Sequence, residues 1–450
     1  MYKTFITFFA LLLLCSPGFG QEDSEGKFNI PKGNLTLDEA CKMVIENNPG
    51  IREVVQRLES AKATVQQARS TLYPAISLTS SYTTFDMTMQ PDWEPTVRMD
   101  ADFQEFKAGL NARWTVFDGF TRRATILAAE ENVLGVTWQI KEAHRLLLEA
   151  VTTTFYQAQL AREQMIIAAQ NWEFNKELQD NATKRWNVGD APESDALTFS
   201  VNAIQAEVQY RSAFRDFQLI TTVLAQLLAL PDSRLPESLL PATDHHLPET
   251  TVVSYETEIE YAKRHRPDLQ ALDSAIRALE LQLKATKGAY WPRLDAIGGF
   301  QYTHTRDNDF VDQDENNAFV GITASFDLFS GFRRDGQVKE VTAILRAQNY
   351  ARENLVNQIS ADIQSRILEL DAARDIYERQ LIAFEQTVKI RDFVEKAYLA
   401  GDAGITRLNE AQTNLVSISG LLASSKLMIR LSRANLQIAS GGILANIEKK

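Results

Sequence analysis

The sequence predicts a mostly α-helical chain built from two copies of one helix–strand–strand–helix unit, with membrane β-barrel strands and long coiled-coil helices. Three observations predict this fold class. Landmark residues of the first half recur in the second half. Each half holds two segments in which apolar and polar residues alternate, which is typical of strands. Each pair of segments is followed by a proline-free stretch whose apolar residues have helical spacing.

Four landmarks of the first half have counterparts in the second half, which indicates a duplicated unit. Two prolines recur 218 residues later (267 − 49 and 292 − 74), and two glycine motifs recur 212 residues later (331 − 119 and 401 − 189). One loop between the two sets is therefore six residues longer in the first half. The pairs are Pro49 and Pro267, Pro74 and Pro292, the Phe-x-Gly-Phe motifs at 117–120 and 329–332, and Gly189 and Gly401.

These landmarks divide the chain into five predicted segments. Clustered prolines break both helices and strand ladders, so the segment between the repeats is expected to be a surface linker. The prediction is a signal peptide over 1–20, a first repeat over 21–230 with a hairpin at about 75–117, a proline-rich linker over 231–252, a second repeat over 253–442 with a hairpin at about 293–329, and a C-terminal tail over 443–450.

The N-terminus has the layout of a cleaved secretory signal peptide. A basic start precedes a mostly apolar run of ten residues at 5–14 and a small-x-small triplet at 18–20. An anchor helix is the alternative, but ten residues are too few for the ~30 Å of hydrocarbon in a bilayer. Lipidation at Cys15 is a second alternative, although Leu14 stands where a lipoprotein signal has a small residue. The mature chain then holds only Cys41, so no intramolecular disulfide can form.

Two helices are expected before the first hairpin. Thr36 and Glu39 form a capping box, in which each side chain satisfies a free backbone donor of the other residue. This helix should end near Asn47, because a residue that precedes proline is pushed out of the helical region. Pro49 then opens the second helix, since the first helical position needs no N–H donor.

The hairpin strands show period-two alternation at 106–116 and 320–328, with partners at 75–85 and 293–304. About ten residues of such alternation are typical of a lipid-facing barrel strand. A soluble, half-buried hairpin fits the same pattern. Export, and the lack of a later apolar run of ~18 residues, favour the barrel, because only helices and closed barrels satisfy the backbone in lipid.

The stretches at 119–189 and 336–401 are free of proline and predict two long helices. Apolar residues in the second stretch recur every three or four positions, which is the seam of a coiled coil. About 65 to 70 residues at 1.5 Å each give a rod of ~100 Å. A returning helix is expected after each stretch, at about 194–230 and 406–440.

Four strands cannot close a barrel, so the chain is predicted to oligomerise. Open sheet edges are forbidden in lipid, and the smallest closed membrane barrels have about eight strands. Two copies would supply eight strands and three would supply twelve. An eight-stranded interior is nearly filled by side chains, so a conducting tube favours three copies.

Composition and motifs argue against nucleic acid binding and catalysis. The formal net charge is -12 and the pI is about 5.1. Proteins that bind nucleic acid usually carry a basic surface, so this charge has the wrong sign. The five histidines lack metal-ligand spacing, and no phosphate loop or nucleophile elbow is present. The acidic tip of the second hairpin lacks the glycine and glutamate spacing of an EF-hand, so a solvated external loop is favoured over a calcium site.

Across the mature sequence, the chain resembles the TolC family of outer-membrane efflux and secretion channels. The resemblance rests on Asn-Asn-Pro at 47–49, Arg-Pro-Asp-Leu at 266–269, the Tyr-Pro and Trp-Pro pairs before the hairpins, and the two Phe-x-Gly-Phe motifs. The segments 185–189 and 398–401 resemble the two helix-turn tips of the family.

The resemblance implies a homotrimer in the bacterial outer membrane, surrounded by outer-membrane lipid, whose twelve-stranded barrel continues into a helical barrel in the periplasm. It further implies a passive exit duct of a tripartite efflux pump or a type I secretion system. The partners would be a periplasmic adaptor protein and an inner-membrane transporter of the RND or ABC type, with no cofactor. The alternative is a structural or adhesive coiled-coil protein of the envelope, without strands. The tips expected to dock the adaptor comprise Val188, Gly189, Asp190, Gly401 and Asp402.

The same resemblance implies a gate at the periplasmic tip. Tyr398 matches the gating tyrosine of the family, Asp195 the aspartate that this tyrosine contacts, and Glu410 a carboxylate that lines the aperture. Arg407 departs from the pattern, because its position is usually acidic, and Ala403 replaces an arginine that forms a lock in some members. We hypothesise that Arg407 supplies the lock by pairing with Asp195 or Glu410. A solvated surface charge is the alternative.

Overall fold

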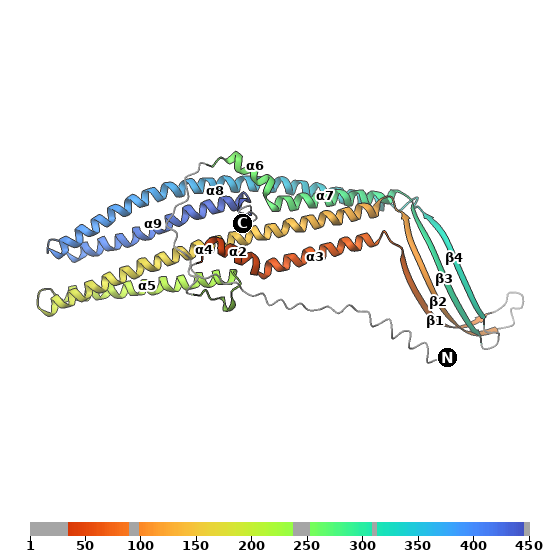
Figure 1. The fold of residues 1–450 in the computed structure, drawn as a ribbon, viewed down its shortest axis with the longest axis horizontal. Helices are drawn as coiled ribbons and strands as arrows, with labels where there is room; N and C mark the ends of the chain where they lie inside the picture. Colours follow the sequence, from red (N-terminus) through yellow and green to blue (C-terminus); the bar gives the residue numbers. More distant parts are fainter. Residues whose placement is uncertain (1–34, 90–98, 237–252, 308–312, 445–450) are drawn as a thin grey trace.

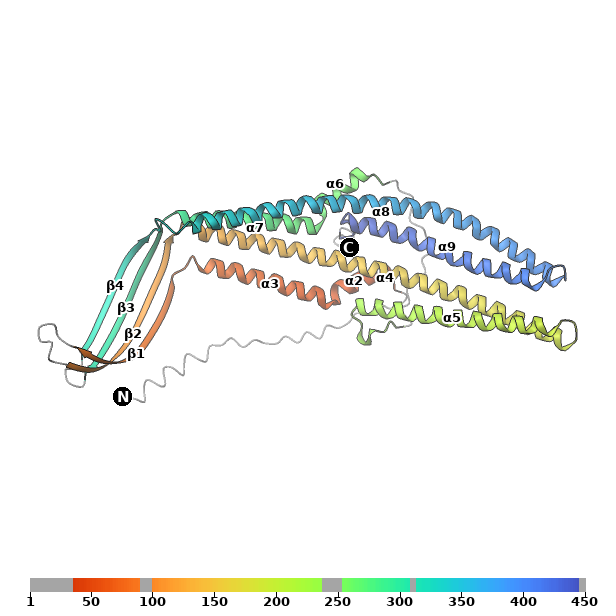
Figure 2. The same cartoon turned by 180° about the vertical axis from the view of Figure 1, so that it is seen from behind.

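The computed structural model shows an elongated molecule, with a β-sheet at one end and two helical hairpins at the other (Figure 1). The helices run along the long axis, as the view from behind also shows (Figure 2). The signal peptide, Cys15, and most of the predicted linker and tail lie outside the described residues. The structure describes residues 35–89, 99–236, 253–307 and 313–444.

Both halves contain the same elements in the same order, which confirms the predicted duplication. The long helices α4 and α8 have 67 residues each, and the returning helices α5 and α9 have 35 each. The first half holds α2 (Leu37–Asn47), α3 (Pro49–Ser70), β1 (Ala75–Met89), β2 (Met99–Phe117), α4 (Thr121–Asn187) and α5 (Glu193–Leu227). The second half holds α6 (Tyr255–His265), α7 (Pro267–Lys287), β3 (Arg293–Asp307), β4 (Gln313–Ser325), α8 (Arg333–Leu399) and α9 (Ile405–Ala439).

The predicted capping box starts α2. The Glu39 backbone N–H donates to Thr36 Oγ1 at 3.3 Å, and the Thr36 N–H donates to Glu39 Oε2 at 3.0 Å. The helix ends at Asn47 and Pro49 opens α3, as predicted. These local signals act through nearby backbone groups, which is why the sequence alone located both boundaries.

The four strands form one antiparallel sheet in the order β1-β2-β3-β4. Its register aligns apolar side chains across neighbouring strands, for example Leu78 with Leu110 and Leu110 with Phe300. The adjacent positions pair polar or small residues, such as Thr79 with Gly109 and Gly109 with Gln301. One face of the sheet is therefore apolar and the other polar, as the alternation predicted.

Strand β4 ends at Ser325, whereas the alternation predicted a strand to position 328. Ser325 pairs with Arg293, the first residue of β3. Pro292 precedes Arg293 and has no N–H to donate, so the ladder has no further partner there. The alternation of apolar and polar residues continues past the last hydrogen-bonded pair of the ladder. The length of β4 predicted from the alternation was therefore too long.

The Phe-x-Gly-Phe motifs form the two junctions between the sheet and the long helices. In each motif the glycine and the following phenylalanine both have positive φ, 66° and 66° at Gly119 and Phe120, and 62° and 60° at Gly331 and Phe332. Two consecutive left-handed residues reverse the chain direction, which costs little for glycine but is strained for phenylalanine. The two rings of each motif pack edge to face, with centroids 5.6 and 5.5 Å apart, and this contact offsets the strain.

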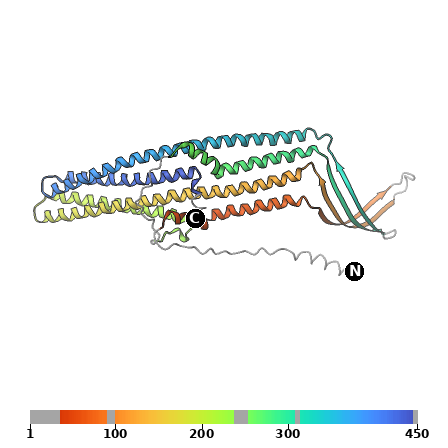
Figure 3. The same cartoon turned by 45° about the horizontal axis from the view of Figure 1, so that its top comes forward.

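The helices lie side by side in a single row at each level of the molecule, so the protomer has two open edges (Figure 3). Near the sheet the order is α3, α4, α7 and α8, and near the hairpin ends it is α5, α4, α9 and α8. Strand β1 lies on the same edge as α3 and α5, and β4 on the same edge as α8. We call these two sides the first edge and the second edge.

Cys41 lies in a hydrophobic core where α2 packs against α4 and the end of α5. Burial is the main cause that raises the pKa of its thiol to about 11, and the nearby Asp38 carboxylate adds to the effect. A thiol in such a position is protonated at neutral pH and therefore unreactive.

We expect Cys41 of the folded mature protein to react with a disulfide reagent at pH 8 on the order of a hundredfold more slowly than after unfolding, because only an accessible thiolate reacts. The absorbance of the released thiol measures both rates, with and without denaturant. Equal rates in the two states would contradict the buried position of this side chain.

Candidate functional site at the hairpin tips

The two helical hairpins turn at glycines, as predicted. Gly189 and Gly401 have φ of 83° and 85°. In the first turn the Asp190 N–H donates to Arg185 O at 2.9 Å, and the Gly189 N–H donates to Trp186 O at 2.9 Å. The second turn repeats both bonds 212 residues later. This pair of hydrogen bonds is the Schellman motif, which requires a left-handed residue, so glycine stands at both positions.

A small apolar cluster, which we call the tip cluster, joins the two hairpins next to these turns. Phe199 of α5 and Leu408 of α9 are fully buried at its centre. The ring of Tyr398 packs edge to face on Phe199, with centroids 6.3 Å apart. The remaining members come from α4, α8 and α9 and include Leu178, Ala182, Val394 and Ala411. The contact between the hairpins at the tip is therefore apolar.

Arg185 is a tip residue to which the sequence assigned no role. Its Nε atom donates to Asp190 Oδ2 at 2.9 Å across the first turn. The hydrogen bond to Asp190 is the main cause that raises the pKa of Arg185, and the Tyr398 hydroxyl contributes to the shift. Arg185 thus connects the first turn with the predicted gating tyrosine of the second hairpin. Only the fold brings these residues together, since they are 213 positions apart (398 − 185).

The other predicted gate residues also lie near the tip. Asp195 is half-buried in the first turn of α5, and Arg407 and Glu410 are exposed on α9. Among the described residues, no hydrogen bond or ion pair joins Tyr398 to Asp195, or Arg407 to Asp195 or Glu410. The proposed lock therefore stays a prediction that concerns contacts between subunits.

Between the tip and the middle of the molecule, α4 and α9 run antiparallel along a contact that we call the seam. Close to the tip cluster the seam is polar and uncharged, and the Gln412 amide donates to Asn171 Oδ1 at 3.0 Å. Asn175 is buried there and donates to the Asn171 carbonyl at 2.8 Å. A cavity of about 260 Å³ adjoins these amides. This part of the seam is therefore lined by polar amides and not by an apolar core.

At the opposite end of the seam, two arginines hold the C-terminus of α9, and we call this group the arginine clamp. Arg266 is 7% exposed, donates to Ala439 O at 3.0 Å, and binds both oxygens of Asp268 at 3.1 and 2.7 Å. Arg145 of α4 is equally buried and binds both oxygens of Glu142 at 2.9 and 2.6 Å. Cations at a helix C-terminus are favourable because of the helix dipole.

The clamp depresses the pKa of Asp268. Burial acts to raise this pKa, but the hydrogen bonds and charge of Arg266, with a contribution from Arg145, outweigh burial and hold the pKa below its ordinary value. The Arg-Pro-Asp motif of the second repeat therefore anchors the end of α9, a role that the sequence did not predict.

The second functional surface is the apolar face of the sheet. Its side chains include Ile76, Leu78, Val320 and Ile322, all of which are exposed in the protomer. Exposed aromatic rings gather where the strands meet the helices, as expected at the boundary between membrane and water. They include Tyr73, Trp291, Phe329 and Phe332.

No group of three or more metal-ligating side chains is found in the part of the chain that the structure describes. The acidic tip of the second hairpin lies partly outside this part.

Comparison with protein families decides the assignment. The family described as outer membrane efflux protein matches residues 40–229 and 259–442 of the chain. The chain belongs to the outer membrane efflux protein family. Both matched segments contain a long helix, a returning helix and a hairpin, so the family pattern covers the sheet as well as the tips.

Relatives and solved structures agree with this family. The chain is 21% identical to outer membrane protein TolC of Salmonella enteritidis over 424 residues, which cover 88% of the chain and 79% of TolC. It is 20% identical to protein CyaE of Bordetella pertussis over 386 residues, which cover 85% of the chain and 79% of CyaE. The CmeC outer membrane channel of Campylobacter jejuni has the same fold, with a TM-score of 0.77 and 16% identity. The superposition covers 92% of this chain and 88% of the CmeC chain.

This efflux protein is an outer-membrane channel component of an efflux or secretion system, as the sequence predicted. The alternative of a strand-free coiled-coil envelope protein is wrong, because the described residues contain a four-stranded sheet. The family is a transport family and not an enzyme family.

Proposed function

We propose that three copies of this chain close head to tail into a ring that forms a continuous exit duct from the periplasm to the outside. The single observation that carries the proposal is the pair of open edges. The first edge of the protomer (α3, α5 and β1) and the second edge (α8 and β4) lie on opposite sides. Joining unlike edges is a heterologous contact, which closes into a ring when the rotation fits.

Exposed apolar side chains on both edges support the ring. Leu197 and Val208 on α5 are 60% and 62% exposed, and Phe393 and Ile382 on α8 are 71% and 58% exposed. Leu197 and Phe393 each lie 8 residues from the glycine of their own tip (197 − 189; 401 − 393). Val208 and Ile382 each lie 19 residues away (208 − 189; 401 − 382). The two edges therefore carry exposed apolar side chains at the same distances from the tips, counted in residues along the helices.

The spacing on α5 has the form of an unpaired coiled-coil seam. Exposed Leu197, Val201, Ile204 and Val208 follow one another at intervals of four, three and four residues. Soluble monomers rarely expose such contiguous apolar stripes, whereas interfaces between subunits do. A neighbouring subunit would cover the stripe.

Helix α9 also has more apolar surface than one protomer covers. Among the described residues, it alone is long and apolar enough to cross a membrane by length and composition, and only 22% of its most apolar window is buried. One such helix is weak evidence for a membrane span. Because α9 lies between α4 and α8, this surface fits a helical barrel better than lipid.

In the sheet, ring closure would pair β1 of one copy with β4 of the next. Three sheets of four strands supply twelve strands, and no edge is left unpaired in lipid. The apolar face would contact outer-membrane lipid, and the polar face would line the pore. The duct itself performs no catalysis and uses no cofactor.

The hairpin tips would dock a periplasmic adaptor protein that is joined to an inner-membrane transporter of the RND or ABC type. The tip residues Val188, Gly189, Asp190, Gly401 and Asp402 are exposed in the protomer. Val188 and Leu399 are large apolar side chains that lie at the very ends of the hairpins. Exposed apolar side chains on a protein that is otherwise strongly acidic fit a protein partner.

We further propose that Tyr398, Asp195, Arg407 and Glu410 form the gate of this duct, with Arg407 paired to an acidic side chain across the subunit boundary. In planar bilayers, Arg407→Ala is expected to raise single-channel conductance, because the lock is lost. Glu410→Ala is expected to weaken block by divalent cations added on the tip side, because a carboxylate of the aperture is lost. Single-channel recording measures both effects.

The matched control is Arg264→Ala, which removes an exposed arginine on α6 whose ion pair, among the described residues, is with Glu260 of the same helix. Unchanged conductance in Arg407→Ala would rule out the lock and leave Arg407 as a solvated charge. A wild-type protein that forms no channel at all would contradict the proposed duct.

A further inference from the structure

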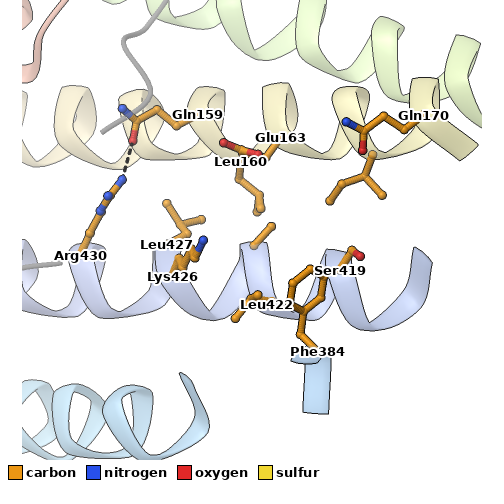
Figure 4. Close-up of a pocket in the computed structure, with 12 residues that line it drawn as sticks. Gln159, Leu160, Glu163, Gln170, Phe384, Ser419, Leu422, Lys426, Leu427 and Arg430 are labelled. Atoms are coloured by element: carbon orange, nitrogen blue, oxygen red, sulfur yellow. Dashed lines mark hydrogen bonds between the residues drawn. The ribbon is translucent and has the colours of Figure 1, made fainter. Parts of the chain in front are cut away.

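A second cavity of about 260 Å³ opens in the seam, between the polar amides near the tip and the arginine clamp (Figure 4). Its lining comes from α4, α9 and one residue of α8. Helix α9 presents Ser419 and Ala423 here, where α4 presents Glu163 and Ile167. The small side chains of α9 cannot fill the space between the two helices, so the seam is hollow at this point.

The walls of this seam cavity are mostly apolar. Leu160 and Ile167 come from α4, Leu422 and Leu427 from α9, and Phe384 from α8. Figure 4 shows side chains of α4 and α9 directed toward each other across the gap. Concave apolar walls with a few polar groups at the margin are the usual construction of a small-molecule site.

One end of the cavity is cationic. Lys426 and Arg430 lie one helical turn apart on α9, on the same face. Gln159, a buried residue that is 8% exposed, accepts a hydrogen bond from Arg430 Nη1 at 3.5 Å, which orients the guanidinium along the wall. Glu163 is the only acidic residue in the lining. Two cations and one anion leave an excess positive charge beside an apolar surface.

We propose that the seam cavity binds a short-chain amphiphilic anion, an alkyl carboxylate or an alkyl sulfonate. Its tail lies on the apolar walls and its head group lies between Lys426 and Arg430. A guanidinium and an ammonium form charge-assisted hydrogen bonds with such a head group. The volume is below the ~300 Å³ that drug-sized ligands require, which limits the tail to a short chain. Glu163 repels the head group and lowers the affinity.

Equilibrium dialysis of radiolabelled octanoate against the mature protein in phosphatidylcholine nanodiscs tests this proposal, and empty nanodiscs correct for partition into lipid. We expect saturable binding with one site per chain. The Lys426→Gln and Arg430→Gln double variant should bind octanoate at least about tenfold more weakly, because both partners of the head group are lost. Glu163→Gln should bind octanoate more tightly, because the repelling charge is removed.

Two further variants separate the cavity from its charges. Ala423→Leu keeps every charge but fills the space, and it should abolish binding. Arg379→Gln removes an exposed cation of α8 outside the cavity, and it should leave binding unchanged. Binding no greater than to empty nanodiscs, equal binding in the double variant, or preference for octylamine over octanoate would each overturn the proposal. Circular dichroism checks that all variants are folded.

Discussion

An Ile204→Asp and Val208→Asp double variant is expected to purify as a monomer, whereas the wild type is expected to purify as a trimer. Both side chains belong to the exposed apolar stripe of α5, which the proposed ring covers with α8 of the next copy. Each interface would then bury two carboxylates without partners, at a cost of more than about 3 kcal/mol. Light scattering coupled to size-exclusion chromatography in detergent measures the number of chains.

The matched control for this variant is Gln209→Asp. It adds a carboxylate at an exposed position of the same helix, one residue beyond Val208 and therefore on a different face from the stripe. We expect it to remain trimeric. If the double variant also assembles into trimers, α5 is not the contact between subunits.

Arg266→Ala is expected to destabilise the protomer by about 3–5 kcal/mol, because it leaves the Asp268 carboxylate without its bidentate partner in a largely buried site. The substitution also removes the hydrogen bond to Ala439 O at the end of α9. The midpoint of thermal loss of helical circular dichroism should fall by several degrees or more. The control is Arg264→Ala, because Arg264 is an exposed residue whose ion pair with Glu260 spans 3.8 Å, and it should cost no more than about 1 kcal/mol.

The clamp also predicts a dependence of stability on pH. The pKa of Asp268 is depressed in the folded protein. Its contribution to stability is therefore fully present above the unfolded value of 3.8 and is lost as the pH falls through the folded pKa. Arg266→Ala should consequently lose less stability than the wild type when the pH falls below about 4. Parallel acid profiles of the two proteins would contradict the role of the clamp.

The order of elements could be read from the sequence because its signals are local. The capping box at Thr36, the prolines at 49 and 267, and the glycines of the tips each act on backbone within a few residues. The duplication strengthened the assignments that rest on the prolines and the glycines, since each of these motifs was seen twice. The end of β4 was predicted wrongly. Alternation indicates which side chains lie on each face of a strand, but it does not indicate where the neighbouring strand ends.

Most of the tip and the seam could not be predicted in this way. Arg185 and Tyr398, Arg266 and Ala439, and Gln159 and Arg430 are pairs of residues far apart in the sequence, and only tertiary packing brings them together. The seam cavity likewise depends on which residue of α4 faces Ala423, which periodicity does not specify. The gate residues were placed by family resemblance, and their contacts depend on neighbouring subunits.

The most direct test of the ring is cross-linking between its two unlike edges. Val208→Cys on α5 and Ile382→Cys on α8 place one thiol on each edge, 19 residues from the respective tip glycine, and the native Cys41 is buried. After treatment with a thiol-specific bismaleimide, the chain with both substitutions should yield a covalent species of three chains, and neither single variant should yield any cross-linked species. Dimers formed by either single variant would show that like edges meet, and would contradict a ring closed head to tail.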